Sequence, residues 1–283
     1  MTGFAKCSYA FRSSQNPQKK YQMKTIIAAG QKRLLALKPR LWPCGTKLLQ
    51  RPRLHASTRE TWDAAIDEGD GDLTIDCQPI MDQTDRPDCW AYATIMCYEV
   101  SHALDGCPIA QLTPDTLPYI TSQWDGGAID SGICIAGPTY GFNFAADLPP
   151  SDPILGVHVP DVAAWPTTWQ QLAARNRTIT NDWIDCANFD DVGDSLIDGW
   201  PCVIGVDWQG GGHALCALEL GGNSQTGYWL SGPNSWGKNW NDGYGSRSDR
   251  PGWFQLREDQ CAAIQSYGAI ACCGTTPASA PTT

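Results

Sequence analysis

Residues 83–92 read QTDRPDCWAY, and this stretch decides the fold. Gln83 stands six residues before Cys89, and Cys89 opens a hydrophobic run with helical spacing. A cysteine at the first turn of a helix faces unpaired backbone N–H groups and the positive end of the helix dipole, which favour its thiolate. The thiolate is the nucleophilic form, so the pattern predicts nucleophilic chemistry at Cys89. A buried cysteine that only packs is the alternative.

A histidine and an asparagine follow downstream. Residues 210–215 read GGGHAL, which places His213 between glycines and an apolar strand, and residues 230–237 read LSGPNSWG and contain Asn234. A cysteine nucleophile needs a histidine to take its proton and a third group to orient that histidine. The sequence therefore supplies all three groups. The other histidines fit less well: His55 precedes the predicted domain, His102 lies far along the Cys89 helix, and His158 sits among prolines.

These segments resemble the signatures of the papain-like cysteine peptidases. The family's first signature, a glutamine, five residues and then C-W-A-F, stands here as Gln83 followed by residues 89–92, CWAY. Its second resembles HAL at residues 213–215. Its third resembles NSWG at residues 234–237, followed by Trp240 and Gly243-Tyr244. The resemblance covers residues 75 to 275, and three signatures in order are specific.

The resemblance implies a role for each matching residue. Cys89 would be the nucleophile, His213 its general base and then the general acid for the leaving amine, and Asn234 the group that orients the imidazole. Gln83 would donate its side-chain amide to the oxyanion together with the Cys89 backbone N–H. Trp236 would cover the hydrogen bond between His213 and Asn234. Peptides or proteins would be the substrates, and no cofactor or metal is expected.

Gly126 and Gly127 resemble the paired glycines along which a substrate backbone lies in this family, although a plain turn is an equal alternative. Three residues depart from the family pattern. Arg86 replaces the cysteine that the family usually has three residues before the nucleophile, and Pro87-Asp88 replaces a glycine and a serine. Asp88 should oppose thiolate formation at Cys89 unless a cation such as Arg86 offsets its charge. We therefore expect slower or more selective chemistry.

The predicted fold class is α+β, a papain-like arrangement of a helical lobe over about 83–165 and a β-barrel-like lobe over about 166–275, with the active site between them. Residues 1–59 form a basic N-terminal arm or pro-segment, 60–76 an acidic linker, 77–275 the catalytic domain and 276–283 a flexible tail. A helix is expected from Cys89 to about Leu104, with the apolar face Ala93, Cys97, Val100 and Leu104. Strands are expected near 75–82, 202–207, 213–220, 227–231, 252–256 and 267–271, and a short helix over 168–175.

The charge is distributed unevenly. Residues 1–59 hold thirteen Lys or Arg and no acidic residue, whereas the remainder holds seven basic and thirty acidic residues, a net charge of −23. The main domain is therefore not expected to bind nucleic acid. Residues 21–38 have helical spacing, with Met23, Ile26, Ile27, Leu34 and Leu37 available for one face. The N-terminal segment could be a disordered tail, a pro-segment over the cleft, a docking arm for an assembly such as a virus particle, or a transit peptide.

Thirteen cysteines, an even twelve without Cys89, are compatible with disulfides. We expect free thiols instead at Cys97, Cys202 and Cys216, which lie in apolar elements, and no secretion signal is evident. The stretch 67–72, DEGDGD, lacks the spacing of a calcium loop. No apolar run reaches transmembrane length, so no membrane is expected as a partner. An intracellular location, or one within an assembled particle, is favoured.

Two functions follow from these patterns. The first is a cysteine peptidase that forms an acyl-enzyme, or a close relative that uses the same chemistry. The second is a papain-like domain that serves mainly as a structural or docking component of a larger assembly, with weak or no activity. The four intact groups Cys89, His213, Asn234 and Gln83 favour the first function.

Overall fold

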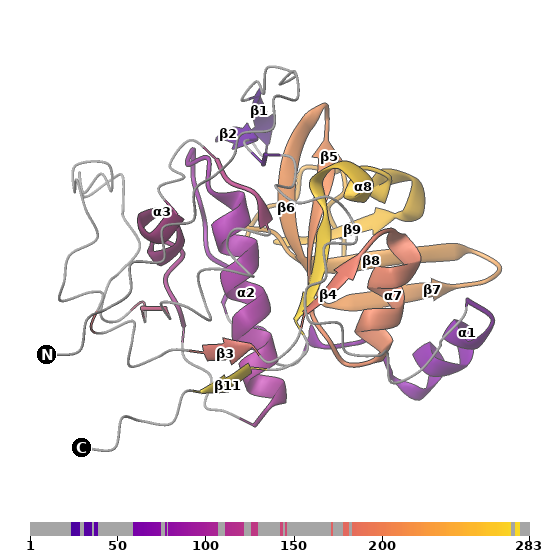
Figure 1. The fold of residues 1–283 in the computed structure, drawn as a ribbon. Coiled ribbons are helices and arrows are strands. Elements are labelled where there is room, and N and C mark those ends of the chain that lie inside the picture. Colours follow the sequence, from indigo (N-terminus) through magenta and orange to yellow (C-terminus); the bar gives the residue numbers. More distant parts are fainter. Residues whose placement is uncertain are drawn as a thin grey trace, which may run out of the picture.

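The computed structural model describes residues 24–28, 31–35, 37–38, 59–74, 77, 79–106, 111–121, 126–129, 142–143, 145, 171, 178–180, 183–272 and 275–277. Within them the chain is α+β, with a helical part and antiparallel sheets (Figure 1). Of the expected helix over 168–175 the structure describes residue 171 alone, which is helical, and His55 and His158 lie outside the described residues.

Helix α2, Cys89–Leu104, begins and ends at the expected residues. It lies at the centre of the molecule and packs against strands β5 and β6 (Figure 1). Its residues from Cys89 to Ser101 are all buried, so it is surrounded on every side rather than amphipathic. Ala93, Cys97 and Val100 are buried as predicted, but Leu104 is 42% exposed because it lies in the last turn.

The first sheet has the order β4 (Trp183–Cys186), β10 (Ala269–Cys272), β5 (Cys202–Trp208) and β6 (Gly211–Ala217), all antiparallel. Gln209 and Gly210 join β5 to β6, and both have positive φ, 54° and 83°. These angles are typical of a two-residue type I′ turn, which fixes the register of the hairpin. The register pairs Val206 with His213, so the turn determines where the histidine lies.

The second sheet contains β7 (Glu219–Asn223), β8 (Gly227–Pro233) and β9 (Trp253–Arg257). The strand expected over 213–220 is therefore two strands, because Leu218 leaves the first sheet and donates its N–H to the Ser231 carbonyl at 2.9 Å. The strand expected near 75–82 does not form in residues 77 and 79–82, the part of it that the structure describes. There, Asp82 makes an isolated β-bridge with Trp236.

The remaining elements are short. Helix α3 (Thr116–Thr121) lies beside α2, and helix α7 (Phe189–Ile197) lies beside the first sheet. Asn188 caps α7 by accepting from the Asp191 N–H at 2.9 Å. The others are the 3₁₀ helix η5 (Glu258–Cys261), helix α8 (Ile264–Tyr267), and the paired strands β3 (Thr178–Thr180) and β11 (Thr275–Pro277).

The helix predicted over 21–38 is wrong, because residues in this segment form a β-hairpin of β1 (Lys24–Ala28) and β2 (Gln31–Leu35). Ile26 and Ala28 are buried on β1, and Arg33 and Leu35 on β2, whereas Thr25, which points to the opposite face of β1, is exposed. Burial at every second residue is the period of a strand. Short apolar runs support either period, and here the packing of β2 against β6 selects the strand.

The acidic stretch after residue 59 is not a solvated linker throughout. Residues Arg59–Glu68 form helix α1, whose Trp62 is fully buried against Phe189 and Tyr228. The Trp62 indole N–H donates to Asp194 at 2.8 Å. A single buried tryptophan thus anchors a helix whose other residues are mostly charged or polar.

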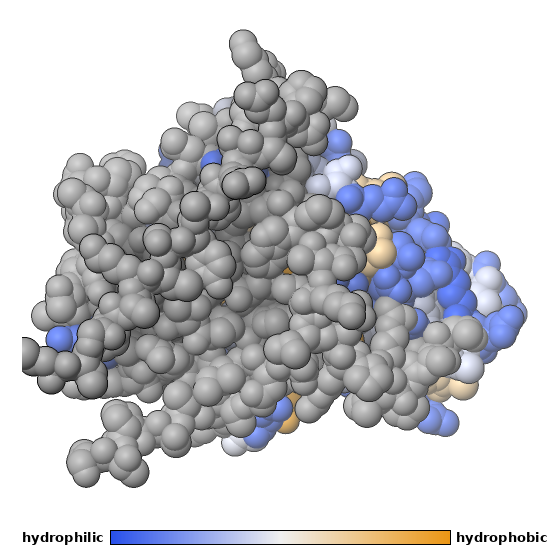
Figure 2. Space-filling model, in the orientation of Figure 1, coloured by the Kyte–Doolittle hydropathy of each residue, from blue (hydrophilic) through white to orange (hydrophobic). Residues whose placement is uncertain are grey.

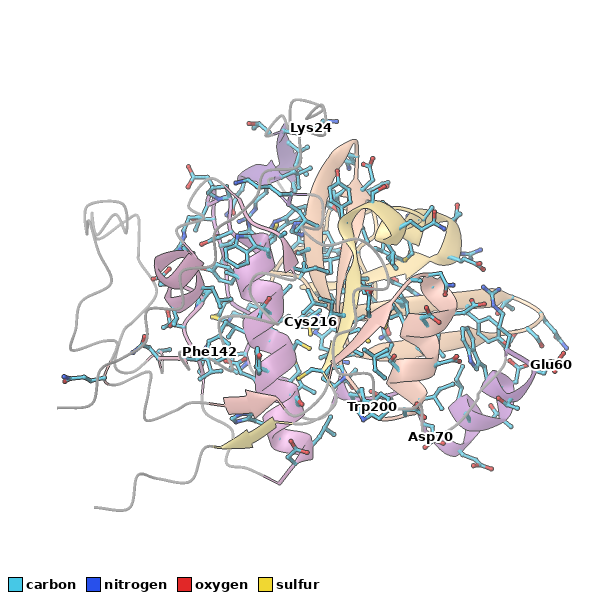
Figure 3. All side chains as sticks on the ribbon, in the orientation of Figure 1. Lys24, Glu60, Asp70, Phe142, Trp200 and Cys216 are labelled. Carbon is cyan, nitrogen blue, oxygen red and sulfur yellow. The ribbon has the colours of Figure 1, made fainter. Side chains whose placement is uncertain are left out.

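The surface and interior follow the expected chemistry. On the face drawn in Figure 2, the described residues on the right are mostly hydrophilic. Cys216 lies between α2 and the first sheet (Figure 3), and no disulfide joins any of the eight cysteines that the structure describes. Among the described helices, none is both long and apolar enough to cross a bilayer.

We expect Trp62→Ala to lower the free energy of unfolding of the full chain by about 3–5 kcal/mol, because it removes a large buried ring and the indole N–H that donates to Asp194. Urea denaturation measures this. Leu104→Ala, at an exposed helical position, is the control and should change stability by less than about 0.5 kcal/mol. A Trp62→Ala effect as small as that of the control would contradict the docking of α1.

Candidate active site

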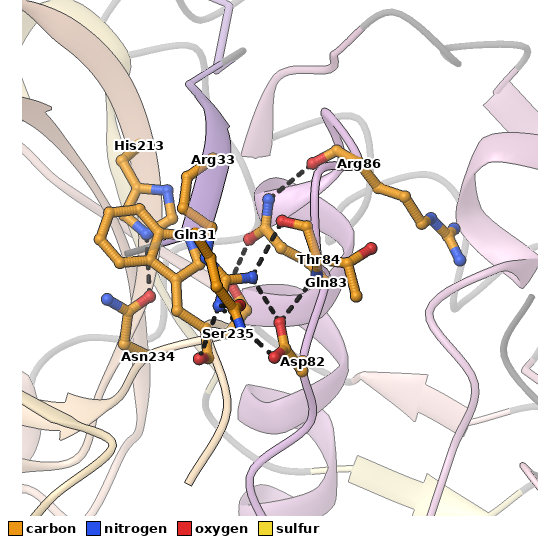
Figure 4. A network of polar contacts seen from close by, with 10 residues as sticks. Gln31, Arg33, Asp82, Gln83, Thr84, Arg86, His213, Asn234 and Ser235 are labelled. Atoms are coloured by element: carbon orange, nitrogen blue, oxygen red, sulfur yellow. Dashed lines mark hydrogen bonds and ion pairs between the residues drawn. The ribbon is translucent and has the colours of Figure 1, made fainter. Parts of the chain in front are cut away.

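His213 and Asn234 meet where the beginning of strand β6 lies next to the end of strand β8. His213 Nε2 lies 2.9 Å from Asn234 Oδ1, and both side chains are fully buried (Figure 4). Because the amide presents its oxygen, Nε2 carries the hydrogen and Nδ1 keeps its lone pair. Among the described residues, Nδ1 has no hydrogen-bond partner. The imidazole is thus held in the tautomer of a general base.

Aromatic rings fix the plane of this imidazole. Trp236 stacks on His213 with ring centroids 4.6 Å apart and planes 25° apart. Trp208 meets the same imidazole edge-on, at 5.6 Å and 77°. Trp208 was missed from the sequence. The register set by the type I′ turn would have predicted this contact. In that register Val206 pairs with His213, and Trp208 is the next residue on the same face of β5.

Gln83 is anchored to both sides of the site. Its backbone N–H donates to the Ser235 carbonyl at 2.7 Å, and its side-chain Oε1 accepts from the Ser235 hydroxyl. Its Nε2 donates one hydrogen to the Arg86 carbonyl at 2.7 Å. An amide nitrogen carries two hydrogens, so a second N–H remains for an oxyanion.

Cys89 is the first residue of α2 and is fully buried, and α2 packs against the strand that carries His213. Asp88 occupies the N-cap position of this helix but makes no side-chain capping hydrogen bond. Its carboxylate pairs with Arg86 instead. The first N–H groups of α2 are therefore not engaged by the Asp88 side chain.

Arg86 forms ion pairs with Asp88 and with Asp115, and all three side chains are largely buried. The offsetting cation that the sequence suggested is thus present. Burial raises the pKa of the Asp88 carboxyl to about 6, against the lowering effect of the Arg86 charge. The cluster ties the loop before Cys89 to the start of α3, at the residue where the family resemblance implied a cysteine.

The N-terminal segment crosses this site. Leu37 donates its backbone N–H to the Gly212 carbonyl at 3.0 Å, and Lys38 donates its own to the Gly127 carbonyl at 3.0 Å. Gly212 precedes His213, whereas Gly127 belongs to the helical part of the molecule. Residues 37–38 therefore bridge the two walls with main-chain hydrogen bonds, in the way that a peptide would.

Glycines make this close approach possible. A Cβ at Gly211 would lie 2.8 Å from the Leu35 Cβ, and a Cβ at Gly212 would lie 2.6 Å from the Leu37 carbonyl oxygen. Any side chain at these two positions would therefore displace the segment. Gly211 and Gly212, here called the glycine floor, form a flat surface on which an incoming backbone can lie.

Comparison with solved structures finds similarity to several cysteine proteases. Digestive procathepsin L 3 of Tenebrio molitor larval midgut matches with a TM-score of 0.53 and 15% identity, over 83% of this chain and 73% of that one. Xylellain, a cysteine protease from Xylella fastidiosa, matches at 0.55 and 18%, over 71% and 84%. The protease and lectin-like domains of Cwp84 from Clostridium difficile match at 0.59 and 12%, over 86% and 57%.

The chain has the papain-like fold. No protein-family model matches the sequence, and no curated protein matches it either. Identities of 12–18% establish the architecture alone, so the roles of individual residues depend on the geometry of this chain.

Within the papain-like fold, the structure brings Gln83, His213 and Asn234 into one network with Ser235 (Figure 4). Trp236 stacks on His213, and the Gly127 carbonyl accepts from a backbone N–H, although that backbone is the chain's own. Gly126 is buried with φ 90° and makes no described contact to the segment.

Burial has a consequence for the imidazole of His213. It lowers the pKa of His213 to about 4, against the raising effect of the hydrogen bond to Asn234, and the nearby charge of Arg33 lowers it further. An imidazole with this pKa remains neutral at pH 7. The folded state binds fewer protons here than the unfolded chain between pH 4 and 6.5, so this residue costs stability as the pH falls through that range.

Asp88 has the opposite linkage. Its folded pKa lies above the unfolded value, so ionisation costs stability as the pH rises from about 4 to 6. We expect the free energy of unfolding of Asp88→Asn to rise by about 2–3 kcal/mol relative to that of the wild type between pH 4 and 7, as measured by urea unfolding at each pH. A pH-independent difference between the two proteins would contradict the assignment.

Asp249→Asn is the control for the direction in which stability changes with pH. A hydrogen bond from Arg247 lowers the pKa of the exposed Asp249 carboxyl, so this carboxylate stabilises the fold above its pKa and the contribution is lost on acidification. As the pH rises, the free energy of unfolding of the wild type should therefore increase relative to that of Asp249→Asn. This is the reverse of the trend expected for Asp88→Asn.

Proposed function

We propose that this protein is a cysteine peptidase that uses Cys89, His213, Asn234 and Gln83. His213 Nδ1 takes the proton of the Cys89 thiol, and the sulfur attacks the scissile carbonyl carbon. The tetrahedral oxyanion accepts from the free Gln83 Nε2–H and the Cys89 backbone N–H. The imidazolium then protonates the leaving amine, and water, activated by His213, hydrolyses the acyl-enzyme.

One observation carries this proposal. The bond of 2.9 Å between His213 Nε2 and Asn234 Oδ1 leaves Nδ1 with a lone pair, on a strand that packs against the helix begun by Cys89. A histidine that served packing alone would not require an amide oxygen, a stacked tryptophan and an unpaired second nitrogen together. The arrangement matches a base that is oriented by a third group.

We further propose that the full chain is a latent form and that the N-terminal segment is a pro-segment. All four proposed catalytic side chains are fully buried, and Leu35 and Leu37 lie on the glycine floor beside His213. Leu35 and Leu37 are themselves fully buried, which supports stable docking. This burial favours the pro-segment over a transit peptide or a docking arm, both of which require an accessible segment.

The main competing function is a structural or docking component with a silent site. The two functions differ in one measurable property, the reactivity of Cys89 once the segment is displaced. A working thiolate–imidazole pair alkylates faster than an ordinary buried thiol.

Latency is tested by Leu35→Asp in the full chain, because a carboxylate at this buried position should displace the segment. We expect a peptidyl epoxide to label Cys89 at least about tenfold faster than in wild type, with the adduct located by mass spectrometry. Thr25→Asp, at an exposed position of the same hairpin, should leave the rate unchanged. Equal rates in Leu35→Asp and wild type would refute the pro-segment.

The chemistry is tested in the Leu35→Asp chain by adding His213→Ala. Without its base, Cys89 should lose its selective labelling, and cleavage of a quenched-fluorescent peptide library should fall at least about 100-fold. Asn234→Ala should reduce the rate through misorientation of the imidazole. If Cys89 labels no faster than the other cysteines in any of these chains, the structural role becomes the better account.

A further inference from the structure

Arg33 is surrounded by hydrogen-bond acceptors next to Trp236, the residue that stacks on His213. We propose that Asp82, the Thr84 carbonyl and Trp236 form a subsite for an arginine side chain. In the latent chain Arg33 occupies it, and after displacement of the segment it takes an arginine of a peptide substrate. The substrate half of this inference rests on the proposed function, whereas the binding half does not.

The guanidinium of Arg33 is almost completely surrounded. One terminal nitrogen donates to Asp82 Oδ1 at 2.5 Å and to the Thr84 carbonyl at 2.9 Å. The other donates to Gln31 Oε1 at 2.6 Å, to the Trp236 carbonyl at 3.1 Å and to Asp82 Oδ2 at 3.4 Å (Figure 4). Arg33 is 2% exposed, and its Cζ lies 6.0 Å from the Trp236 ring.

Most of these acceptors belong to the catalytic domain. Asp82, Thr84 and Trp236 supply a carboxylate and two carbonyls, and only Gln31 comes from the hairpin itself. The carboxylate, the two carbonyls and the aromatic ring of the domain match the planar fork of a guanidinium, whose two terminal nitrogens can donate to several acceptors at once. An ammonium would satisfy fewer of these acceptors. The domain therefore offers a site shaped for arginine rather than for positive charge alone.

The backbone holds the acceptors in place. Thr84 has φ 54°, an uncommon conformation for a β-branched residue, and its N–H donates to Asp82 Oδ1 at 2.8 Å. Asp82 pairs with Trp236 in an isolated β-bridge. A Cβ at Gly237 would lie 3.0 Å from Asp82 Oδ2, so the absence of a side chain there leaves room for the carboxylate.

The subsite lies along the track of a bound peptide. Residues 37–38 of the segment contact Gly212 and Gly127, and Arg33 contacts the carbonyl and the ring of Trp236, which stacks on His213. A peptide that follows the same floor would place a side chain over Asp82. We therefore infer that substrates with arginine on the Trp236 side of the scissile bond are preferred.

Binding is tested by chemical rescue in the full chain. Arg33→Ala should raise the iodoacetamide alkylation rate of Cys89 at least about tenfold, because the Asp82 carboxylate loses its partner and docking weakens. Ethylguanidinium should then slow alkylation again, whereas ethylammonium at the same concentration should not. Arg59→Ala removes an arginine that pairs with Asp190 and Glu258, outside the cleft, and should leave the rate at the wild-type value.

Two outcomes would overturn the subsite. The first is an Arg33→Ala chain that alkylates at the wild-type rate. The second is a rescue in which ethylguanidinium is no better than ethylammonium. Alkylation requires an accessible Cys89 but no turnover, so rescue without peptide cleavage would support the subsite and count against the proposed function.

Substrate preference is tested in the Leu35→Asp chain with peptides that carry arginine or citrulline, its neutral isostere, at each position around the scissile bond. We expect arginine to raise kcat/KM about tenfold over citrulline at one position on a single side of the bond. Asp82→Asn should reduce that ratio to near one. Cleavage without any preference for arginine would overturn the subsite and leave the proposed function standing.

Discussion

The hydrogen bond between His213 Nε2 and Asn234 Oδ1 is the interaction on which the site depends. It fixes the tautomer of the imidazole and joins the end of β8 to β6. The type I′ turn at Gln209-Gly210 sets the register of β6, and Trp236 and Trp208 hold the plane of the ring. Each of these features would have little purpose if the histidine were free to rotate.

We propose that the same burial that orders the imidazole also silences it. Leu35, Leu37 and Lys38 lie against the glycine floor and Gly127, and Arg33 adds a positive charge beside the ring that stacks on His213. A buried imidazole with a pKa near 4 and an inaccessible thiol form a site that is assembled but closed. The proposed latent form and the proposed arginine subsite both rest on the docking of these residues.

Part of this structure follows from sequence and part does not. Helix α2 and the strands around His213 were predictable, because long apolar periods and glycine turns are local signals. The hairpin at 24–35 and helix α1 were not. Their apolar residues are few, and Ile26, Leu35 and Trp62 become core only through contact with distant strands. Arg33 was hidden among thirteen basic residues, and only its buried partners distinguish it from a solvated charge.

The most direct measurement is the titration of His213 by NMR in the full chain with ¹⁵N-labelled histidine. The account predicts a neutral imidazole with its hydrogen on Nε2 at pH 7, protected from exchange and titrating with a pKa near 4. A His213 that titrates near 6.5, with a rapidly exchanging ring hydrogen, would show a solvated imidazole and contradict the closed, Asn234-oriented site.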